Sequence, residues 1–281
     1  MEVFQSKEGV NQEIYKYRNK GNTVGFVPTM GALHEGHISL INCSVGQNNI
    51  TVVSIFVNPA QFNQRADYEK YPRDLSKDLD RLEKVGVDLV FTPTEKEMYP
   101  EEDNRQFDFG HLDKVLEGAH RPGHFNGVAQ IVSKLFETII PDRAYFGEKD
   151  FQQLVIIKKL TEKLKMDIEI VACPIKREES GLAMSSRNER LSKEQHENAA
   201  LISKVLFSSL EKAKEKSPEE LKAWATEELN KNPFIDVEYF DIVDENTLHP
   251  VKSFSETFYK RACVAAWVGN VRLIDNVKFY F

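Results

Sequence analysis

The chain has few cysteines, no surplus of positive charge and no long apolar run, and each shortage excludes a class of protein. Its 281 residues include only three cysteines, Cys43, Cys173 and Cys263. An odd number of widely spaced cysteines predicts reduced, buried thiols in the cytoplasm rather than a disulfide framework. No apolar stretch approaches the length of a membrane span. The first eight residues lack the basic segment and apolar core of a signal peptide, so we expect a cytoplasmic protein without membrane association.

The charge balance argues against a nucleic-acid partner. Lysine and arginine number 37 against 44 aspartates and glutamates, which gives a formal net charge of −7 at pH 7. Such a chain has no general field that attracts a phosphate polymer, and no stripe of basic residues stands out. Any binding of an anionic nucleotide must therefore depend on local cations beside phosphate-binding turns.

The first 175 residues alternate short apolar runs with helical patterns. The apolar runs predict strands at 23–28, 50–57, 87–92, 143–147 and 168–173. Apolar residues at helical spacing predict helices over 75–85, 128–139 and 154–164. Strands that alternate with helices predict an α/β domain with a mainly parallel sheet, in which ligands bind outside the carboxyl ends of the strands.

From about residue 176 the pattern changes. Residues 194–213 have a helical pattern, and Ser217-Pro218-Glu219-Glu220 is a capping box that starts a second helix running to about Asn230. Strand-like runs follow at 235–243, 262–268 and 271–274. Helices followed by strands predict a smaller α+β domain. We therefore expect two domains, residues 1–175 and 176–281.

The most informative segment is PTMGALHEGH, residues 28–37, which joins a predicted strand to a predicted helix. Gly31 and Gly36 have no Cβ, so backbone or ligand can approach closely at this turn. A helix start also offers N–H groups and the positive end of its dipole, which suits a phosphate chain. His34 and His37 are three residues apart and share one helical face. These features together predict a site for nucleoside triphosphate chemistry.

Two other interpretations of the histidine pair remain open on the residues alone. An isolated pair is by default two surface histidines on a helix. A zinc site is a weaker interpretation, because the spacing is H-x-x-H rather than H-E-x-x-H and no third ligand is obvious.

Two further segments follow predicted strands. In FVNPAQF, residues 56–62, Pro59 ends the strand, and Asn58 and Gln61 offer neutral hydrogen-bonding groups at the sheet edge, although Asn-Pro is also an ordinary turn. In YFGEKDFQQ, residues 145–153, a glycine turn precedes Lys149 and Asp150, which suit a phosphate and a ribose. The alternative is a surface helix capped by Asp150.

Two loops complete the candidates. Residues 176–188, KREESGLAMSSRN, combine hydroxyls, an arginine and small residues at the predicted domain junction, which favours a closing lid over a plain connector. Residues 118–127, GAHRPGHFNG, precede the strongest amphipathic helix. There Asn126 is a candidate N-cap, and Arg121 is a candidate for facing substrate.

Taken together, these segments resemble the pantothenate synthetase (pantoate–β-alanine ligase) family of the H-x-G-H nucleotidyltransferase superfamily. The matching stretches are PTMGALHEGH (28–37), FVNPAQF (56–62), DYEKYPRD (67–74), RPGHFNGV (121–128), FGEKDFQQL (146–154), GLAMSSRN (181–188) and, less specifically, RLIDN (272–276). Glu35 stands where the wider superfamily has the isoleucine of HIGH, and MSSRN stands where synthetases have KMSKS. Both differences argue against tRNA charging.

The resemblance implies the following site. The ATP-binding residues would be Met30, Gly31, Ala32, Leu33, His34, Glu35, Gly36, His37, Gly147, Glu148, Lys149, Asp150, Lys176, Met184, Ser185, Ser186 and Arg187. The catalytic residues among them would be His34, His37, Lys149 and Arg187, with His37 as proton donor. Gln61 would bind both pantoate and β-alanine, and Gln153 would bind pantoate. Asn58, Tyr71 and Arg121 are secondary candidates, and no residues are expected to form an all-protein metal site.

The resemblance also implies a reaction and an assembly. The reaction would be the ATP-dependent condensation of (R)-pantoate with β-alanine through pantoyl adenylate, with Mg²⁺ bound to ATP. The fold would be a Rossmann-like domain with a smaller C-terminal lid, in a homodimer. The alternatives are an adenylyltransferase that stops at nucleotide transfer, a nucleotide-sensing module without catalysis and, more remotely, a zinc hydrolase.

Overall fold

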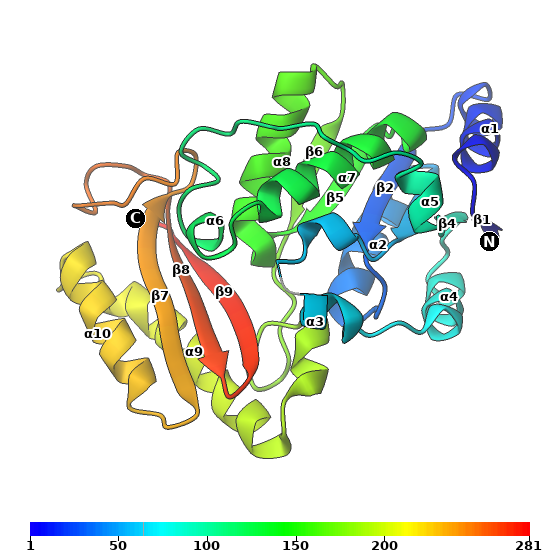
Figure 1. Cartoon of the computed structure of the whole chain (residues 1–281). Helices are drawn as coiled ribbons and strands as arrows, with labels where there is room; N and C mark the ends of the chain where they lie inside the picture. The colour runs from blue at the N-terminus through cyan, green and yellow to red at the C-terminus, as the bar shows by residue number, and fades with distance from the viewer. Residues whose placement is uncertain (64) are drawn as a thin grey trace. The chain divides into compact units, whose positions relative to one another are not determined.

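The computed structural model describes residues 1–63 and 65–281, which divide into two compact units (Figure 1). Unit 1 comprises Met1–Phe109, Arg121–Glu148 and Ile156–Pro174. Unit 2 comprises Gly110–His120, Lys149–Val155 and Ile175–Phe281. Each unit therefore contains more than one stretch of the chain, and each is described by itself.

Unit 1 is built on a six-stranded sheet in the order β1-β4-β3-β2-β5-β6, with every pairing parallel. The strands are β1 (Glu2–Phe4), β2 (Val24–Thr29), β3 (Ile50–Ile55), β4 (Leu89–Phe91), β5 (Arg143–Gly147) and β6 (Glu169–Cys173). The parallel α/β architecture predicted from the alternating pattern is confirmed. Strand β1 was not predicted, because three residues are too few to show a periodicity.

Helices connect the strands of unit 1. They are α1 (Lys7–Arg18), α2 (Glu35–Gln47), α3 (Arg65–Glu69), α4 (Leu75–Lys84), α5 (Glu95–Met98), α7 (His124–Ile139) and α8 (Phe151–Leu164), with 3-10 turns η1 (Pro59–Gln61) and η2 (Glu148–Asp150). Apolar side chains of α2, the central strands and α4 form one core cluster, which includes Ile41, Val53, Leu82 and Tyr145. The first residue of α8 belongs to unit 2 and its last to unit 1.

The start of α7 differs from the prediction. Asn126 was expected to be the N-cap, but the helix begins at His124 and its cap is Gly123, which adopts a left-handed φ of 80°. Asn126 lies inside the helix, where its Oδ1 accepts from the backbone N–H of Phe107 at 2.9 Å and its Nδ2 donates to the carbonyl of Arg105 at 3.2 Å. A loop-binding role therefore replaces the capping role.

Unit 2 contains the antiparallel sheet β7-β8-β9 and two long helices. Its elements are α6 (Glu117–His120), η3 (Ser186–Arg190), α9 (Lys193–Lys212), α10 (Pro218–Asn230), β7 (Ile235–Asp244), β8 (Lys260–Val268) and β9 (Val271–Phe279). Ser217 and Glu220 form the expected capping box of α10. The smaller α+β architecture is confirmed, with Leu206, Leu221 and Phe240 in its core.

Strand β9 is five residues longer than its predicted run, 271–274. The predicted strand ended at residue 274 because two polar residues, Asp275 and Asn276, interrupt the apolar sequence. Both pair with β8 opposite Val264 and Cys263, and both are buried. Buried polar side chains in a central stretch of strand require specific partners, and these are described below.

The described cysteines are free, and no described helix is long and apolar enough to span a bilayer. Cys173 and Cys263 are buried, whereas Cys43 is only half-buried. The prediction that all three thiols are buried is therefore wrong for Cys43, which lies in α2 with its neighbours Asn42 and Gly46 exposed.

Candidate functional site

The turn after β2 is held by a buried carboxylate from α4. Gly31 and Ala32 have left-handed φ values of 81° and 49°. Asp78 Oδ2 accepts from the N–H of Ala32 at 2.9 Å, and its Oδ1 accepts from the N–H of Leu33 at 2.8 Å. Arg81 Nη1 donates to the Leu33 carbonyl at 2.6 Å. A Cβ at Gly31 would lie 2.8 Å from Asp78 Oδ2, so this position requires glycine.

Asp78 was not predicted from the sequence. Its side chain is 3% exposed, and burial raises its pKa above the usual value despite the two backbone N–H groups. A signal was present, because Asp78 lies between Leu75 and Leu82 at helical spacing and so interrupts the apolar face of α4. A carboxylate on a buried helix face must find donors, and here the donors belong to the phosphate-binding candidate loop.

His34 and His37 lie together at the start of α2, with ring centroids 4.1 Å apart. His34 is the N-cap, and His37 is the third residue of the helix. The Nδ1 atom of His34 accepts from the N–H of Gly36 at 3.1 Å, and the Nδ1 atom of His37 accepts from the N–H of His34 at 3.3 Å. A backbone N–H can only donate, so each neutral ring carries its proton on Nε2. Both rings are thereby Nε2–H donors at the positive end of a helix.

Gln61 lies at the end of η1 and is fixed through both its side chain and its backbone. Its Oε1 accepts from Asn58 Nδ2 at 3.2 Å, and its Nε2 donates to Met30 Sδ at 3.0 Å. Its carbonyl contacts His124 Nδ1 at 2.8 Å and accepts from Arg121 Nη2 at 3.5 Å. The structure therefore brings Gln61 next to Met30, the first predicted nucleotide-binding residue.

The secondary candidates of unit 1 have defined partners. Asn58 is 1% exposed and caps η1. Tyr71 is buried and packs edge-on against Phe62, with ring centroids 5.8 Å apart. Arg121 contacts the backbone of Gln61, as given above. Gly147 and Glu148, from the predicted nucleotide segment after β5, also belong to unit 1.

In unit 2, one dipeptide links the two predicted nucleotide-binding segments. Asn276 Nδ2 donates to the Lys149 carbonyl at 3.0 Å. Asp275 accepts two hydrogen bonds from Arg177, at 2.6 and 2.9 Å. Arg177 directly follows Lys176. Asp275 and Asn276 were noted in the sequence only as part of the stretch RLIDN, with no predicted role.

Backbone and side-chain hydrogen bonds close the loop over residues 176–188. The N–H of Met184 donates to the Lys176 carbonyl at 3.0 Å, and Ser185 Oγ accepts from the N–H of Arg187 at 3.3 Å. Asn188 Nδ2 donates to the Ala183 carbonyl at 3.1 Å. The stretch 184–187, in which Ser186 is buried, therefore lies beside Lys176 within unit 2.

The remaining candidates lie at the start of α8. Lys149 Nζ lies 3.6 Å from Asp150 Oδ1, and Gln153 is a half-exposed residue in the first turn of the helix. Its neighbour Gln152 is buried and donates to the carbonyls of Leu112 and Val115. Among the side chains that the structure describes, no cluster of three or more from histidine, cysteine, aspartate or glutamate is arranged to hold a metal ion.

Comparison with known proteins identifies the family. The family model for pantoate-beta-alanine ligase matches residues 2–278. The chain belongs to the pantoate–β-alanine ligase family. Curated relatives include the pantothenate synthetase of Bacteroides fragilis strain YCH46, which is 51% identical over 99% of both chains. That of Bacteroides thetaiotaomicron is 50% identical over the same shares.

Solved structures of this family have the same fold. The pantothenate synthetase of Thermus thermophilus covers 100% of both chains with a TM-score of 0.94 at 40% identity. The pantoate-beta-alanine ligase of Francisella tularensis, described as complexed with beta-gamma ATP and beta-alanine, covers 99% of this chain and 97% of its own, with a TM-score of 0.83 at 35% identity. The likeness to the ligase family thus extends over the full length of the chain.

Proposed function

We propose that the chain catalyses the ATP-dependent condensation of (R)-pantoate with β-alanine to pantothenate, with release of AMP and pyrophosphate. The observation that carries the proposal is the pair of imidazoles at the start of α2, each held with its proton on Nε2. Such a pair offers two donors to a polyphosphate at a helix N-terminus. Family membership and the Francisella tularensis structure described with ATP and β-alanine support the choice of substrates.

In the first step, a carboxylate oxygen of pantoate attacks the α-phosphorus of ATP. The bond from that phosphorus to the bridging oxygen breaks, and pantoyl adenylate and pyrophosphate result. Negative charge grows on the leaving pyrophosphate, where His34, His37, Lys149 and Arg187 would stabilise it. His37 would donate from Nε2. The remaining ATP-binding candidates would hold the nucleotide through backbone N–H groups and through Lys176.

In the second step, the neutral amine of β-alanine attacks the acyl carbon of the adenylate, the bond from that carbon to the phosphate oxygen breaks, AMP leaves, and the nitrogen gives up one proton as the amide forms. Gln61 and Gln153 would hold pantoate, and Gln61 would also contact β-alanine. The stretch 184–187 would cover the nucleotide and exclude water, because a mixed anhydride hydrolyses readily when solvent reaches it. The C-terminal domain would thus act as a lid on the nucleotide-binding domain.

Three finer points belong to the same proposal. ATP would react as its Mg²⁺ complex, in which the ion takes phosphate oxygens and water rather than a cage of protein ligands. The enzyme would be a homodimer. It would act in the cytoplasm.

A coupled assay for AMP release, with pantoate, β-alanine, ATP and Mg²⁺ each omitted in turn, tests the reaction. We expect AMP release to require all four. Release that persists without β-alanine, with a nucleotide-bearing product, would identify an adenylyltransferase instead. ATP binding with no turnover under any condition would identify a sensing module. Sedimentation of the purified chain tests the dimer.

A further inference from the structure

The hydrogen bonds around Asn58 fix the direction of two carboxamides. Both Nδ2 protons of Asn58 are used, one on the Gly127 carbonyl at 3.1 Å and one on Gln61 Oε1 at 3.2 Å. Its Oδ1 accepts from the Tyr99 hydroxyl at 2.7 Å and from the Ala60 N–H at 3.4 Å. A backbone carbonyl can only accept and a backbone N–H can only donate, so both favour this orientation of Asn58, and the Tyr99 hydroxyl supplies the shorter of the two contacts to Oδ1.

The orientation of the Asn58 carboxamide determines the orientation of the Gln61 carboxamide. Because Asn58 presents an N–H to Gln61, the atom of Gln61 that faces it must be the oxygen. The Nε2 group of Gln61 is then on the opposite side, where it contacts Met30 Sδ. Gln61 therefore presents its Nε2 group on the side of the candidate nucleotide-binding loop, with one N–H directed at Met30 Sδ and a second N–H left to donate, while its oxygen faces Asn58. A partner there must supply an acceptor, as a carboxylate oxygen does.

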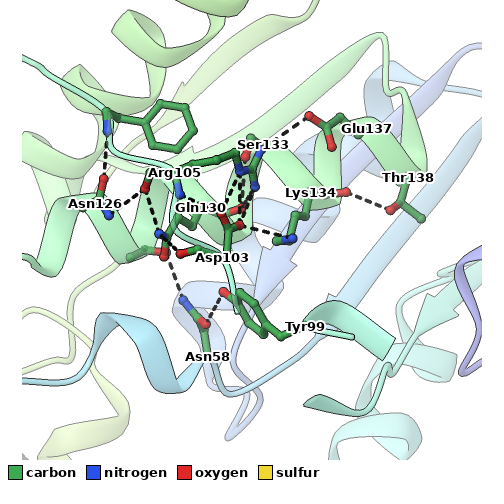
Figure 2. Close-up of polar contacts among 12 residues, drawn as sticks. Asn58, Tyr99, Asp103, Arg105, Asn126, Gln130, Ser133, Lys134, Glu137 and Thr138 are labelled. Atoms are coloured by element: carbon green, nitrogen blue, oxygen red, sulfur yellow. Dashed lines mark hydrogen bonds and ion pairs between the residues drawn. The ribbon is translucent and has the colours of Figure 1, made fainter. Parts of the chain in front are cut away.

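Tyr99 completes the arrangement and is itself held in place. Burial raises the pKa of its hydroxyl well above the usual value, so the group stays protonated and donates to Asn58. Its ring lies beside Lys134, whose Nζ is 5.2 Å from the ring centroid and 3.2 Å from Asp103 Oδ2 (Figure 2). Tyr99 is thus tied to helix α7, as is Asn58 through Gly127.

We propose that Tyr99 is a positioning residue for the ligase reaction, which acts through Asn58 to keep the Gln61 carboxamide turned with its N–H groups toward the substrate. The role makes the Gln61 subsite selective for an acceptor, such as a carboxylate oxygen, over an N–H donor, such as the NH2 group of a primary amide. It rests on the proposed function of Gln61 and adds Tyr99, which acts through Asn58.

Steady-state kinetics of Tyr99→Phe tests the proposal. The variant keeps the ring but leaves Asn58 Oδ1 with only the long contact to Ala60. We expect the KM of pantoate or β-alanine to rise about fivefold, the size of one neutral hydrogen bond, while kcat and the KM of ATP stay within about twofold. The control is Tyr145→Phe, which removes another buried hydroxyl, one that contacts Asn48 and Gln47 outside the site. This control should lower stability without changing any KM.

Asn58→Asp gives the stronger test of direction. The ionised carboxylate that this variant introduces has no N–H for Gln61, so Gln61 must turn its own N–H groups inward and its oxygen toward the substrate. We expect the KM of the carboxylate substrate to rise at least about tenfold, and the primary amide of pantoate, as a competing ligand, to lose less affinity than pantoate does.

A double-mutant cycle separates positioning from general damage. If Tyr99 acts through Gln61, then adding Tyr99→Phe to Gln61→Ala changes no KM further. A persistent effect of Tyr99→Phe in the Gln61→Ala background would overturn the proposal, as would an unchanged KM in Tyr99→Phe alone. If the wild-type chain makes no pantothenate, the proposed function fails. Crystal structures of the wild type and of Tyr99→Phe then still test whether Tyr99 orients Asn58 and Gln61. Unmoved Asn58 and Gln61 carboxamides in Tyr99→Phe would overturn the proposal.

Discussion

Asn58 and Gly127 are joined in a way that depends on the glycine having no side chain. Asn58 Nδ2 donates to the Gly127 carbonyl at 3.1 Å, and a Cβ on Gly127 would lie 2.2 Å from the carbonyl oxygen of Ala60. The 3-10 turn that carries Gln61 therefore lies directly on helix α7. The distance between this turn and the helix therefore sets the position of the Gln61 backbone, from which its side chain extends.

Gly127→Ala is expected to displace η1 from α7 and with it Gln61. Contacts of 2.2 and 2.5 Å to the backbone of Ala60 cannot be relieved by rotating a side chain. We expect the KM of pantoate to rise at least about tenfold and stability to fall by about 1–3 kcal/mol, the usual cost of overpacking. Gly46→Ala is the matched control. It lies in helix α2 with nothing within 4 Å of the added Cβ, so helix propensity predicts about 1 kcal/mol of added stability and unchanged kinetics. Normal kinetics in Gly127→Ala would contradict the role given to this contact.

We expect His37→Ala and Lys149→Ala to slow formation of the adenylate by roughly two to three orders of magnitude each, because in the proposed mechanism each side chain donates to charge that grows in the transition state. Rapid-quench measurement of pantoyl adenylate reports this step directly. Lys158→Ala, an exposed lysine later in the same helix as Gln153, serves as the control for Lys149. A loss of less than about fivefold in both variants would remove the two residues from the mechanism.

Asp103→Asn tests how much the loop around Asp103, which precedes α7, contributes to stability. The Arg105 guanidinium and Lys134 hold the pKa of the Asp103 carboxyl well below its usual range, and its side chain is only 5% exposed. Three α7 side chains spaced four residues apart, Asn126, Gln130 and Lys134, bind this loop (Figure 2). We expect the free energy of unfolding at about pH 7 to fall by about 2 kcal/mol, the size of hydrogen bonds to a charged group.

The effect of Asp103→Asn on stability should depend on pH. The depressed folded-state pKa stabilises the protein above the unfolded value of about 3.9, and this contribution is lost as the pH falls through and below that value. The difference between wild type and Asp103→Asn in urea unfolding should therefore shrink as the pH is lowered from about 5 toward about 3. The exposed pair Lys159–Glu162 supplies the control, Glu162→Gln, with an expected change below about 0.5 kcal/mol. A difference that stays constant with pH would exclude the charge as its cause.

Two of the cysteines should resist alkylation. Burial raises the pKa of the Cys173 and Cys263 thiols to about 12, so neither forms appreciable thiolate in neutral buffer. We expect native protein treated with iodoacetamide at about pH 8 to label Cys43 first, and all three residues to react in urea. Since the unfolded thiols ionise near about pH 8.5, stability should fall as the pH rises above that value. Labelling of native Cys173 at the rate of a free thiol, read by mass spectrometry, would refute the burial argument.

The sequence predicted the regular elements because their signals are local. Helix α10 begins at its capping box because Ser217 and Glu220 satisfy N–H groups within one turn, whatever the rest of the chain does. Strands β2, β3 and β5 are mostly apolar and buried along most of their length, as is typical of strands covered on both faces of a parallel sheet. His34 and His37 are likewise within one turn, so their proximity followed from spacing alone.

The sequence misplaced features whose partners are distant. Asparagine is a residue type favoured at N-caps. The Asn126 amide instead binds the backbone of Phe107 and Arg105, which lie 19 and 21 residues earlier in the chain. The predicted end of β9 at residue 274 failed for the same reason. Asp275 tolerates burial in a strand because Arg177, 98 residues away, neutralises it.

By itself, the sequence determined the two architectures and the residue types of the candidate site, since apolar periodicity, caps and glycine turns act over a few residues. Only the tertiary structure decided that Asp78 holds the turn at Ala32 and Leu33, and that Tyr99 orients Asn58. These pairs are 46, 45 and 41 residues apart. A buried donor or acceptor is matched to whichever complementary group the packed fold brings within hydrogen-bond distance, and no local pattern of residues encodes that match.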